Sequence, residues 1–103
     1  MMKLVAVTAC PSGVAHTYLA AESLAVAAEK QGVEIHVETQ GSIGIEDELK
    51  AADIAAADAV ILTNNIGIKN EERFKGKPVV RLSAGDCINK SDALITKLKA
   101  KFA

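Results

Sequence analysis

The fold is decided by the stretch Leu4-Val-Ala-Val-Thr-Ala-Cys10-Pro-Ser-Gly-Val-Ala-His16-Thr17. Its first half is apolar at successive positions, which is typical of a β-strand that is buried on both faces. Pro11, Ser12 and Gly13 interrupt this pattern, and an Ala- and Leu-rich run from Val14 predicts a long helix. A cysteine at such a junction faces the unpaired N–H groups and the positive dipole of a helix amino end. These stabilise a thiolate and bind oxyanions such as phosphate.

Strand-like and helix-like segments alternate along the rest of the chain, which is typical of a parallel sheet with crossover helices. The predicted strands are Lys3–Thr8, Val33–Thr39, Ala59–Thr63 and Val79–Leu82. Helices or helical turns are predicted at Val14–Gln31, from Glu46, at Glu71–Lys75 and from Asp86 onward. We therefore expect an α/β fold with three layers, a four-stranded parallel open sheet flanked by helices.

The order of the predicted strands places Cys10. Right-handed crossovers and the burial pattern favour the order 2-1-3-4. In this order the chain reverses direction between strands 1 and 3, and ligands of open parallel sheets bind at such a switch point, beyond the carboxyl ends of the strands. Cys10 should lie there, with the loop Asn64-Asn65 beside it.

The second predicted strand differs from the others because its residues alternate. Its polar side chains would face water, which predicts an edge strand with one wet face carrying Glu34, His36 and Glu38. The segment Gln40-Gly41-Ser42-Ile43-Gly44 predicts a loop. Simple turn chemistry is favoured there over an arrangement in which Gln40 and Ser42 lie beside the site at Cys10 or a partner, because the second strand is distant from that site. The second helix would then open with three acids, Glu46, Asp47 and Glu48.

The composition excludes several classes of protein. With 103 residues, we expect one domain over residues 1–103. Half of the residues are hydrophobic but only 3% are aromatic, so the core must be aliphatic. The net charge of −1 does not give the basic surface of a nucleic-acid-binding protein, and no apolar run reaches the roughly 20 residues of a membrane span. We expect neither a nucleic-acid partner nor insertion into a membrane.

The two cysteines, Cys10 and Cys87, do not make a disulfide framework and lack metal-ligand spacing. Together with the lack of a secretory signal, this predicts a cytoplasmic protein with reduced thiols. Cys87 lacks the sequence context of Cys10 and is expected to be a buried structural residue. His36 is expected on a solvated strand face without a metal, because no ligand residues occur at a fitting spacing.

The segment around Cys10 contains the groups that a covalent phosphoryl carrier requires. A free thiol is mostly protonated at neutral pH, and a helix amino end lowers its pKa. Residues Pro11 to Thr17 would form a phosphate-binding loop. Pro11 would stiffen this loop, and Gly13 would let its backbone approach the phosphate closely. Backbone N–H donors would come from Ser12, Val14, Ala15, His16 and Thr17. The hydroxyls of Ser12 and Thr17 would add donors.

His16 would either supply positive charge when protonated or only cap and orient the loop. No metal or cofactor is expected, because the loop itself supplies the charge complementarity.

The spacing Cys10-x5-His16-Thr17 resembles the tyrosine-phosphatase loop, Cys-x5-Arg-Ser/Thr. Here the arginine that clamps two phosphoryl oxygens is missing, and so is any Asp-Pro pair such as low-molecular-weight phosphatases use as a general acid. These differences favour a protein that passes phosphate onward over one that hydrolyses it. Two alternatives stay open: a cysteine-dependent phosphatase or arsenate reductase, and a nucleotide-binding or regulatory module that uses the loop as an anion site.

Five segments that together run over nearly the whole chain carry a further signal. They are Val7-Thr-Ala-Cys-Pro-Ser-Gly-Val-Ala-His-Thr-Tyr-Leu-Ala-Ala-Glu22, Val37-Glu-Thr-Gln-Gly-Ser-Ile-Gly-Ile-Glu46, Ala52-Asp-Ile54, Ala57-Asp-Ala-Val-Ile61 and Arg73-Phe-Lys-Gly-Lys-Pro78. These segments resemble the fructose-family enzyme IIB of the bacterial phosphoenolpyruvate-dependent sugar phosphotransferase system (PTS). The chain departs from that family at Ser12, where Thr is common, and at Asn64-Asn65-Ile66-Gly67, where an Ala-Asp-containing run is more usual.

The resemblance implies a phosphotransferase with a phosphocysteine intermediate. In that family the cysteine at the position of Cys10 accepts phosphate from a phosphohistidine of enzyme IIA. It then donates the phosphate to a sugar, fructose or a fructose-like compound, held by the membrane channel enzyme IIC. The implied location is the cytoplasm, with transient presence at the inner face of the plasma membrane. The family's four-stranded parallel sheet flanked by helices agrees with the fold predicted from the pattern.

Overall fold

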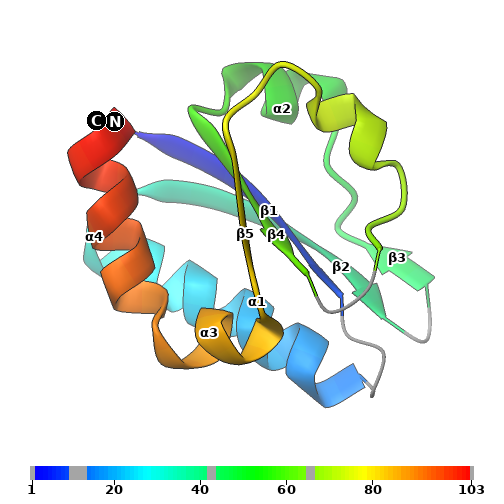
Figure 1. Ribbon diagram of the computed structural model, residues 1–103, viewed down its shortest axis with the longest axis horizontal. Helices are drawn as coiled ribbons and strands as arrows, with labels where there is room; N and C mark the ends of the chain where they lie inside the picture. Colours follow the sequence, from blue (N-terminus) through cyan, green and yellow to red (C-terminus); the bar gives the residue numbers. More distant parts are fainter. Residues whose placement is uncertain (1, 10–13, 42–43, 65–66, 103) are drawn as a thin grey trace.

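The computed structural model describes residues 2–9, 14–41, 44–64 and 67–102. Strands and helices alternate along these residues (Figure 1). The strands are β1 (Lys3–Ala9), β2 (Glu34–Gly41), β3 (Gly44–Glu46), β4 (Ala59–Thr63) and β5 (Val79–Leu82). The helices are α1 (Val14–Lys30), α2 (Ala51–Ala56), the 3-10 helix η1 (Glu71–Phe74), α3 (Ala84–Asn89) and α4 (Ser91–Phe102).

The strands form one sheet in the order β3-β2-β1-β4-β5. The four strands β2, β1, β4 and β5 are parallel, in the order predicted from the sequence. The prediction of a four-stranded sheet is wrong, because β3 adds a fifth strand that runs antiparallel to β2. Gln40 and Gly41 continue β2 instead of leaving it, and Gly44, with a φ of 108° that favours glycine, begins the returning strand.

Helices cover both faces of the sheet, so the molecule has the three predicted layers (Figure 1). The alternation of β1 explains why two cores form, since Leu4 and Ala6 point to one face and Val5 and Val7 to the other. On the first face α1, α3 and α4 contribute Leu24, Cys87, Ile95 and Leu98. On the second face α2 and η1 contribute Ile54 and Phe74. Both cores are largely aliphatic, as predicted.

The helices after β3 begin and end at other residues than the sequence predicts. The helix α2 starts at Ala51, not at Glu46, because Glu46 belongs to β3 and Asp47 adopts a left-handed backbone with φ 52°. The predicted closing helix is two helices. Ser83 caps α3 by accepting a hydrogen bond from the Asp86 N–H at 3.0 Å, and Lys90, with φ −125° and ψ 23°, separates α3 from α4.

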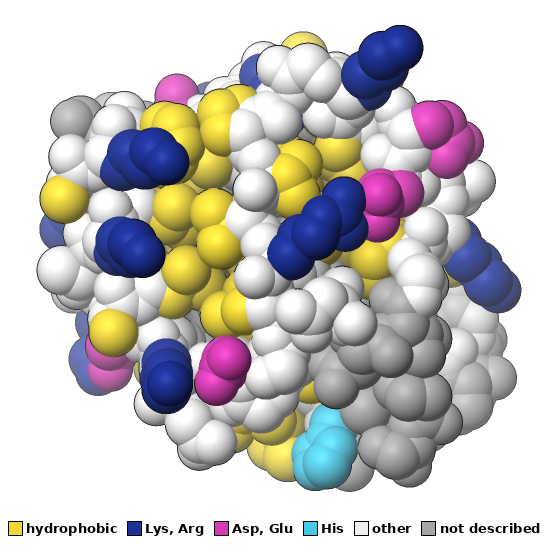
Figure 2. Space-filling view, in the orientation of Figure 1, with side chains coloured by type: hydrophobic (Ala, Val, Ile, Leu, Met, Phe, Trp, Pro, Cys, Tyr) yellow, Lys and Arg dark blue, Asp and Glu magenta, His cyan; other side chains and the backbone are white. Residues whose placement is uncertain are grey.

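The hydrophobic core between the sheet and α1, α3 and α4 is not completely shielded from solvent. Figure 2 shows hydrophobic side chains reaching the surface among lysines on the face formed by α4 and β5. The partly buried residues that pack against this core are Ile35, Val37, Val80, Leu82, Ile88, Leu94 and Phe102. Among the described residues, no helix has both the length and the apolar character needed to cross a membrane.

Candidate functional site

The candidate site lies where the central strand β1 ends and α1 begins. β1 ends at Ala9 and α1 starts at Val14, so the connection between them consists of residues 10–13. The predicted nucleophile Cys10 and the loop residues Pro11, Ser12 and Gly13 lie outside the described residues, as do Ser42 and Asn65. The structure therefore defines the surroundings of this connection: the carboxyl ends of β1, β2 and β4 and the first turns of α1.

Thr63, the last residue of β4, binds the last residue of β1 with its side chain. Its Oγ1 accepts a hydrogen bond from the Ala9 N–H at 2.9 Å and donates one to the Ala9 carbonyl at 3.0 Å. The register between the two strands runs from Leu4–Ala59 to Val7–Leu62. Both Thr63 and Ala9 are buried. The last register pair of the two strands is Val7–Leu62, and Ala9 lies two residues beyond Val7. The Thr63 hydroxyl therefore holds Ala9, the residue that precedes Cys10, beyond the end of this register.

On the other side of β1, Ala9 is the register partner of Gln40 in β2. The buried side chain of Gln40 is fixed in turn. Its Oε1 accepts a hydrogen bond from the Lys69 N–H at 2.8 Å, and its Nε2 donates to the Lys69 carbonyl at 3.1 Å and to Glu38 Oε2 at 2.8 Å. The prediction of simple turn chemistry at Gln40 is wrong, because this side chain ties the segment before η1 to the strand end.

Glu38 is the largest difference from the predicted side-chain pattern. The alternating pattern predicts a wet strand face for this residue, but it is fully buried and forms a bidentate ion pair with Arg73 of η1. Arg73 Nη1 donates to Oε1 at 2.7 Å and Nη2 to Oε2 at 2.6 Å, and the Leu49 N–H donates to Oε1 at 2.9 Å. The wet face was expected because a glutamate in an alternating strand is normally solvated.

The pKa of the Glu38 carboxyl lies below its ordinary value. Burial raises the pKa, but the hydrogen bonds from Arg73, Gln40 and the Leu49 N–H, together with the positive charge of Arg73, outweigh this effect. The hydrogen bond with Glu38 raises the pKa of Arg73. The sequence does contain one signal for this ion pair, which is the arginine at position 73. Arginine is suited to bidentate, partly buried ion pairs, and only two arginines occur in the chain.

The first turns of α1 lie against the end of β1. Thr17 is fully buried, and its carbonyl accepts a hydrogen bond from the Thr8 hydroxyl at 3.0 Å. The Thr17 hydroxyl is also buried, and none of the described residues offers it a hydrogen-bond partner. The side chain of His16 is exposed. Of the predicted loop, the structure therefore places His16 at the surface and Thr17 against β1.

Tyr18 in the second turn of α1 reaches the short strand β3. Its hydroxyl donates a hydrogen bond to Glu46 Oε1, which links α1 to the returning end of the β2–β3 hairpin. Glu46 therefore serves as a tertiary contact rather than as a helix-start acid, because the chain folds back as β3 at this residue.

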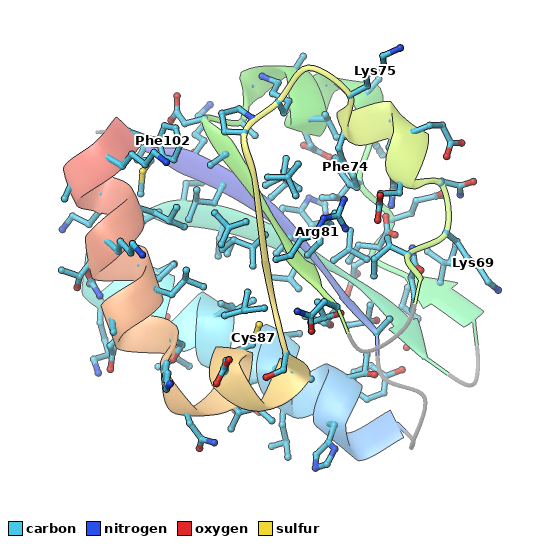
Figure 3. The ribbon with its side chains drawn as sticks, in the orientation of Figure 1. Lys69, Phe74, Lys75, Arg81, Cys87 and Phe102 are labelled. Atoms are coloured by element: carbon cyan, nitrogen blue, oxygen red, sulfur yellow. The ribbon has the colours of Figure 1, made fainter. Side chains whose placement is uncertain are left out.

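The remaining predictions concern Cys87 and His36. Cys87 is fully buried in α3, as predicted for a structural residue, and lies on the side of α3 that packs toward the sheet (Figure 3). Burial, with a smaller contribution from the charge of Asp86, raises the pKa of Cys87 to about 11. His36 Nε2 lies 3.0 Å from the Asp47 carbonyl oxygen, and Nδ1 lies 3.5 Å from Asp53 Oδ2. Residues 2–9, 14–41, 44–64 and 67–102 contain no group of three His, Cys, Asp or Glu side chains that would hold a metal.

Known proteins resemble this chain over most of its length. The family model described as "PTS system, Lactose/Cellobiose specific IIB subunit" matches residues 5–97. The "PTS system fructose-like EIIB component 2" of Escherichia coli (strain K12) is 59% identical over 103 residues, which is 100% of this chain and 97% of that protein. A crystal structure of a domain of the fructose-specific IIABC component from Borrelia burgdorferi has a TM-score of 0.88 at 50% identity, covering 93% of this chain and 91% of that one.

A further relative carries the same region inside a longer protein. The fructose-specific EIIB'BC component of Vibrio cholerae is 47% identical over 89 residues, which is 86% of this chain but 15% of that protein. The family model names lactose and cellobiose, whereas these relatives, which are similar over most or all of the chain, are named for fructose. The chain therefore belongs to the IIB subunits of the sugar phosphotransferase system, in the fructose family, and is a phosphotransferase component of sugar transport.

Proposed function

We propose that this protein carries a phosphoryl group on Cys10 between two partners. The Cys10 thiolate attacks the phosphorus of a phosphohistidine on enzyme IIA, and the electrons of the breaking P–N bond stay on the imidazole. A sugar hydroxyl bound to the membrane enzyme IIC then attacks the same phosphorus. The S–P bond breaks as the new O–P bond forms, the proton of the sugar hydroxyl passes to water, and the thiolate is returned.

The observation that carries this proposal is the position of Ala9. This residue precedes Cys10 and ends the central strand β1. The chain continues from β1 into α1 on one face of the sheet, whereas after the neighbouring strand β4 it continues into η1 on the other face. Ligands of open parallel sheets bind at this kind of switch point. The amino end of the 17-residue helix α1 follows after four residues and favours a negative charge on the sulfur and on the phosphoryl oxygens.

The proposed phosphate-binding loop runs from Pro11 to Thr17. The backbone N–H groups of Ser12, Val14, Ala15, His16 and Thr17 would stabilise the equatorial oxygens during an in-line transfer. The Thr17 hydroxyl supports this proposal by its position, because it is buried in the first turns of α1, at the helix end that follows Cys10, and would add a donor there. His16, at the surface beside this helix end, would add positive charge when protonated.

The arginines of the chain favour transfer to a sugar over hydrolysis. Phosphatases with a Cys-x5-Arg loop use a free guanidinium to clamp the phosphoryl oxygens. The chain contains two arginines, Arg73 and Arg81, and each binds a carboxylate with both of its terminal nitrogens, Arg73 to Glu38 and Arg81 to Glu71. A phosphocysteine here would lack the group that supports the attack of water, and the phosphatase or arsenate reductase alternative is disfavoured.

The substrate and partners follow from the relatives. We propose a fructose-like sugar, because several relatives are named as fructose or fructose-like components. The name of the Vibrio cholerae relative joins B and C components, which supports docking of this protein to a membrane enzyme IIC. The protein would then act in the cytoplasm and reach the inner face of the plasma membrane only during transfer.

The test follows the fate of the phosphoryl group. The protein is labelled by a phosphorylated enzyme IIA and purified, and the label is chased with membranes containing the cognate enzyme IIC and fructose. We expect the label on sugar phosphate within the mixing time and slow release of inorganic phosphate without membranes. Rapid release of inorganic phosphate from the isolated labelled protein would instead identify a phosphatase.

A further inference from the structure

We infer that Thr63 is a positioning residue for the transfer reaction: its hydroxyl fixes the peptide group that joins Ala9 to Cys10. The inference rests on the proposed role of Cys10. Thr63 touches neither the sulfur nor the phosphoryl group in this role. It acts through Ala9, whose N–H and carbonyl are both bound to the same Oγ1 atom, at 2.9 Å and 3.0 Å.

The bond to the carbonyl matters most for direction. The Ala9 carbonyl and the Cys10 nitrogen belong to one peptide group, which is planar. Fixing the carbonyl therefore fixes the plane from which the chain continues into Cys10. The bond to the Ala9 N–H fixes the peptide group before it, so that both planes adjoining Ala9 are held.

At the end of β4, the main chain pairs with β5 on the side away from β1. Thr63 is the register partner of Leu82 in β5, and the next N–H, that of Asn64, donates to the Leu82 carbonyl at 2.9 Å. The end of β4 thus pairs with β5. The side chain of Thr63 supplies the link back to β1, and it does so next to the position at which Cys10 follows.

The contact has the properties of a rigid link. Thr63 is 1% exposed and Ala9 is fully buried, so water does not compete for these two hydrogen bonds. A hydroxyl has one proton, and here that proton is used toward Ala9. On the other side Ala9 is the register partner of Gln40. Ala9 therefore lies between Gln40 of β2 and Thr63 of β4, and the hydrogen bonds to its own N–H and carbonyl come from Thr63.

Loss of this link is expected to slow transfer because the reaction is in line. A nucleophile that is displaced by about 1 Å loses on the order of 100-fold in rate. Thr63→Val keeps the shape of the side chain and removes the hydroxyl. We expect the single-turnover rate of phosphoryl transfer from enzyme IIA to fall about 10- to 100-fold, with little change in the concentration of IIA needed for half-maximal rate. Thr63→Ser restores the hydroxyl and should transfer at nearly the wild-type rate.

The matched control is Thr39→Val. Thr39 is also a buried threonine near a strand end, in β2, but its hydroxyl has no hydrogen-bond partner among the described residues. The same chemical change there should leave the transfer rate within about twofold of wild type. Thermal melts of all variants set a temperature at which each is folded. Should Thr63→Val not fold, Thr63→Ala removes the same hydroxyl without the branched side chain.

A partner-independent measurement completes the test. Amide hydrogen exchange at Ala9 should be faster in Thr63→Val than in wild type and Thr63→Ser, relative to amides in the middle of β1. Equal transfer rates in wild type and Thr63→Val, or unchanged exchange at Ala9, would overturn the inference. Wild-type protein that accepts no phosphoryl group on Cys10 would instead overturn the proposed function, while the exchange measurement still tests the link between Thr63 and Ala9.

Discussion

Replacing Glu38 by Gln should destabilise the protein more than any other change of one atom in a polar side chain of β2. Four hydrogen bonds reach the Glu38 carboxylate, and all come from donors: two from Arg73, one from Gln40 and one from the Leu49 N–H. A glutamine side chain offers one acceptor oxygen and one NH₂ group. In Glu38→Gln the NH₂ group would point at hydrogen-bond donors, so these donors would lose their acceptor. The positive charge of Arg73 would also lose its counter-ion.

The magnitude follows from burial. Glu38 is fully buried, and the side chain of Arg73 is 17% exposed. Removing one member of a buried ion pair typically costs about 3–5 kcal/mol. The partial exposure of Arg73 allows some rehydration, so we expect a loss of about 2–4 kcal/mol in the free energy of unfolding. For a domain of this size such a loss lowers the melting temperature by on the order of 15 °C.

Urea denaturation followed by circular dichroism measures this loss, at neutral pH and with the slope of the transition checked for constancy. The control is Glu34→Gln in the same strand. Glu34 pairs with Lys3 at 3.8 Å, and their side chains are 59% and 50% exposed, so the change there should stay within about 0.5 kcal/mol. If Glu38→Gln and Glu34→Gln cost the same, the buried pair does not hold η1 to the strand end and the reasoning is refuted.

Two further predictions follow from the pKa shifts. Because the folded-state pKa of Glu38 lies below its ordinary value of 4.5, its contribution is fully present above that value and is lost as the pH falls through the folded pKa. Wild-type stability should therefore decrease more steeply below pH 4.5 than that of Glu38→Gln, and parallel acid profiles would contradict this. Cys87, with a pKa of about 11 and no exposed surface, should resist alkylation by iodoacetamide at neutral pH until urea unfolds the protein. Mass spectrometry of peptides from native and unfolded samples checks this, and fast modification of native Cys87 would show that α3 opens readily.

The sequence predicted the parallel part of the sheet because its strands are short, mostly apolar segments. Ala59–Thr63 is buried along its whole length, whereas Val79–Leu82 carries the exposed Arg81, and both predicted strands have the observed bounds. The order of the parallel strands followed from the handedness of crossovers, which does not depend on side-chain detail. The location of the connection between β1 and α1, which contains Cys10, followed in turn, since only the ends of two strongly patterned elements had to be located.

Tertiary polar contacts were not predictable in the same way. The alternation in β2 describes which side chains share a face, but whether Glu38 meets water depends on Arg73, which lies far along the chain. β3 escaped prediction because it has three residues, too few for a periodic pattern, and because its start depends on the turn that Gly44 permits. The link from Thr63 to Ala9 arises where two strands separate, and no local sequence pattern records such a contact.

The central claim is that one sulfur atom, that of Cys10, carries the phosphoryl group. The most direct measurement is peptide mass spectrometry of protein phosphorylated by the phosphoenolpyruvate-dependent relay proteins and a cognate enzyme IIA, with Cys10→Ser and Cys87→Ser treated in parallel. We predict a single phosphoryl group on the peptide that contains Cys10, its loss in Cys10→Ser and its retention in Cys87→Ser. A phosphoryl group on His16 or His36, or one that persists in Cys10→Ser, would contradict the account.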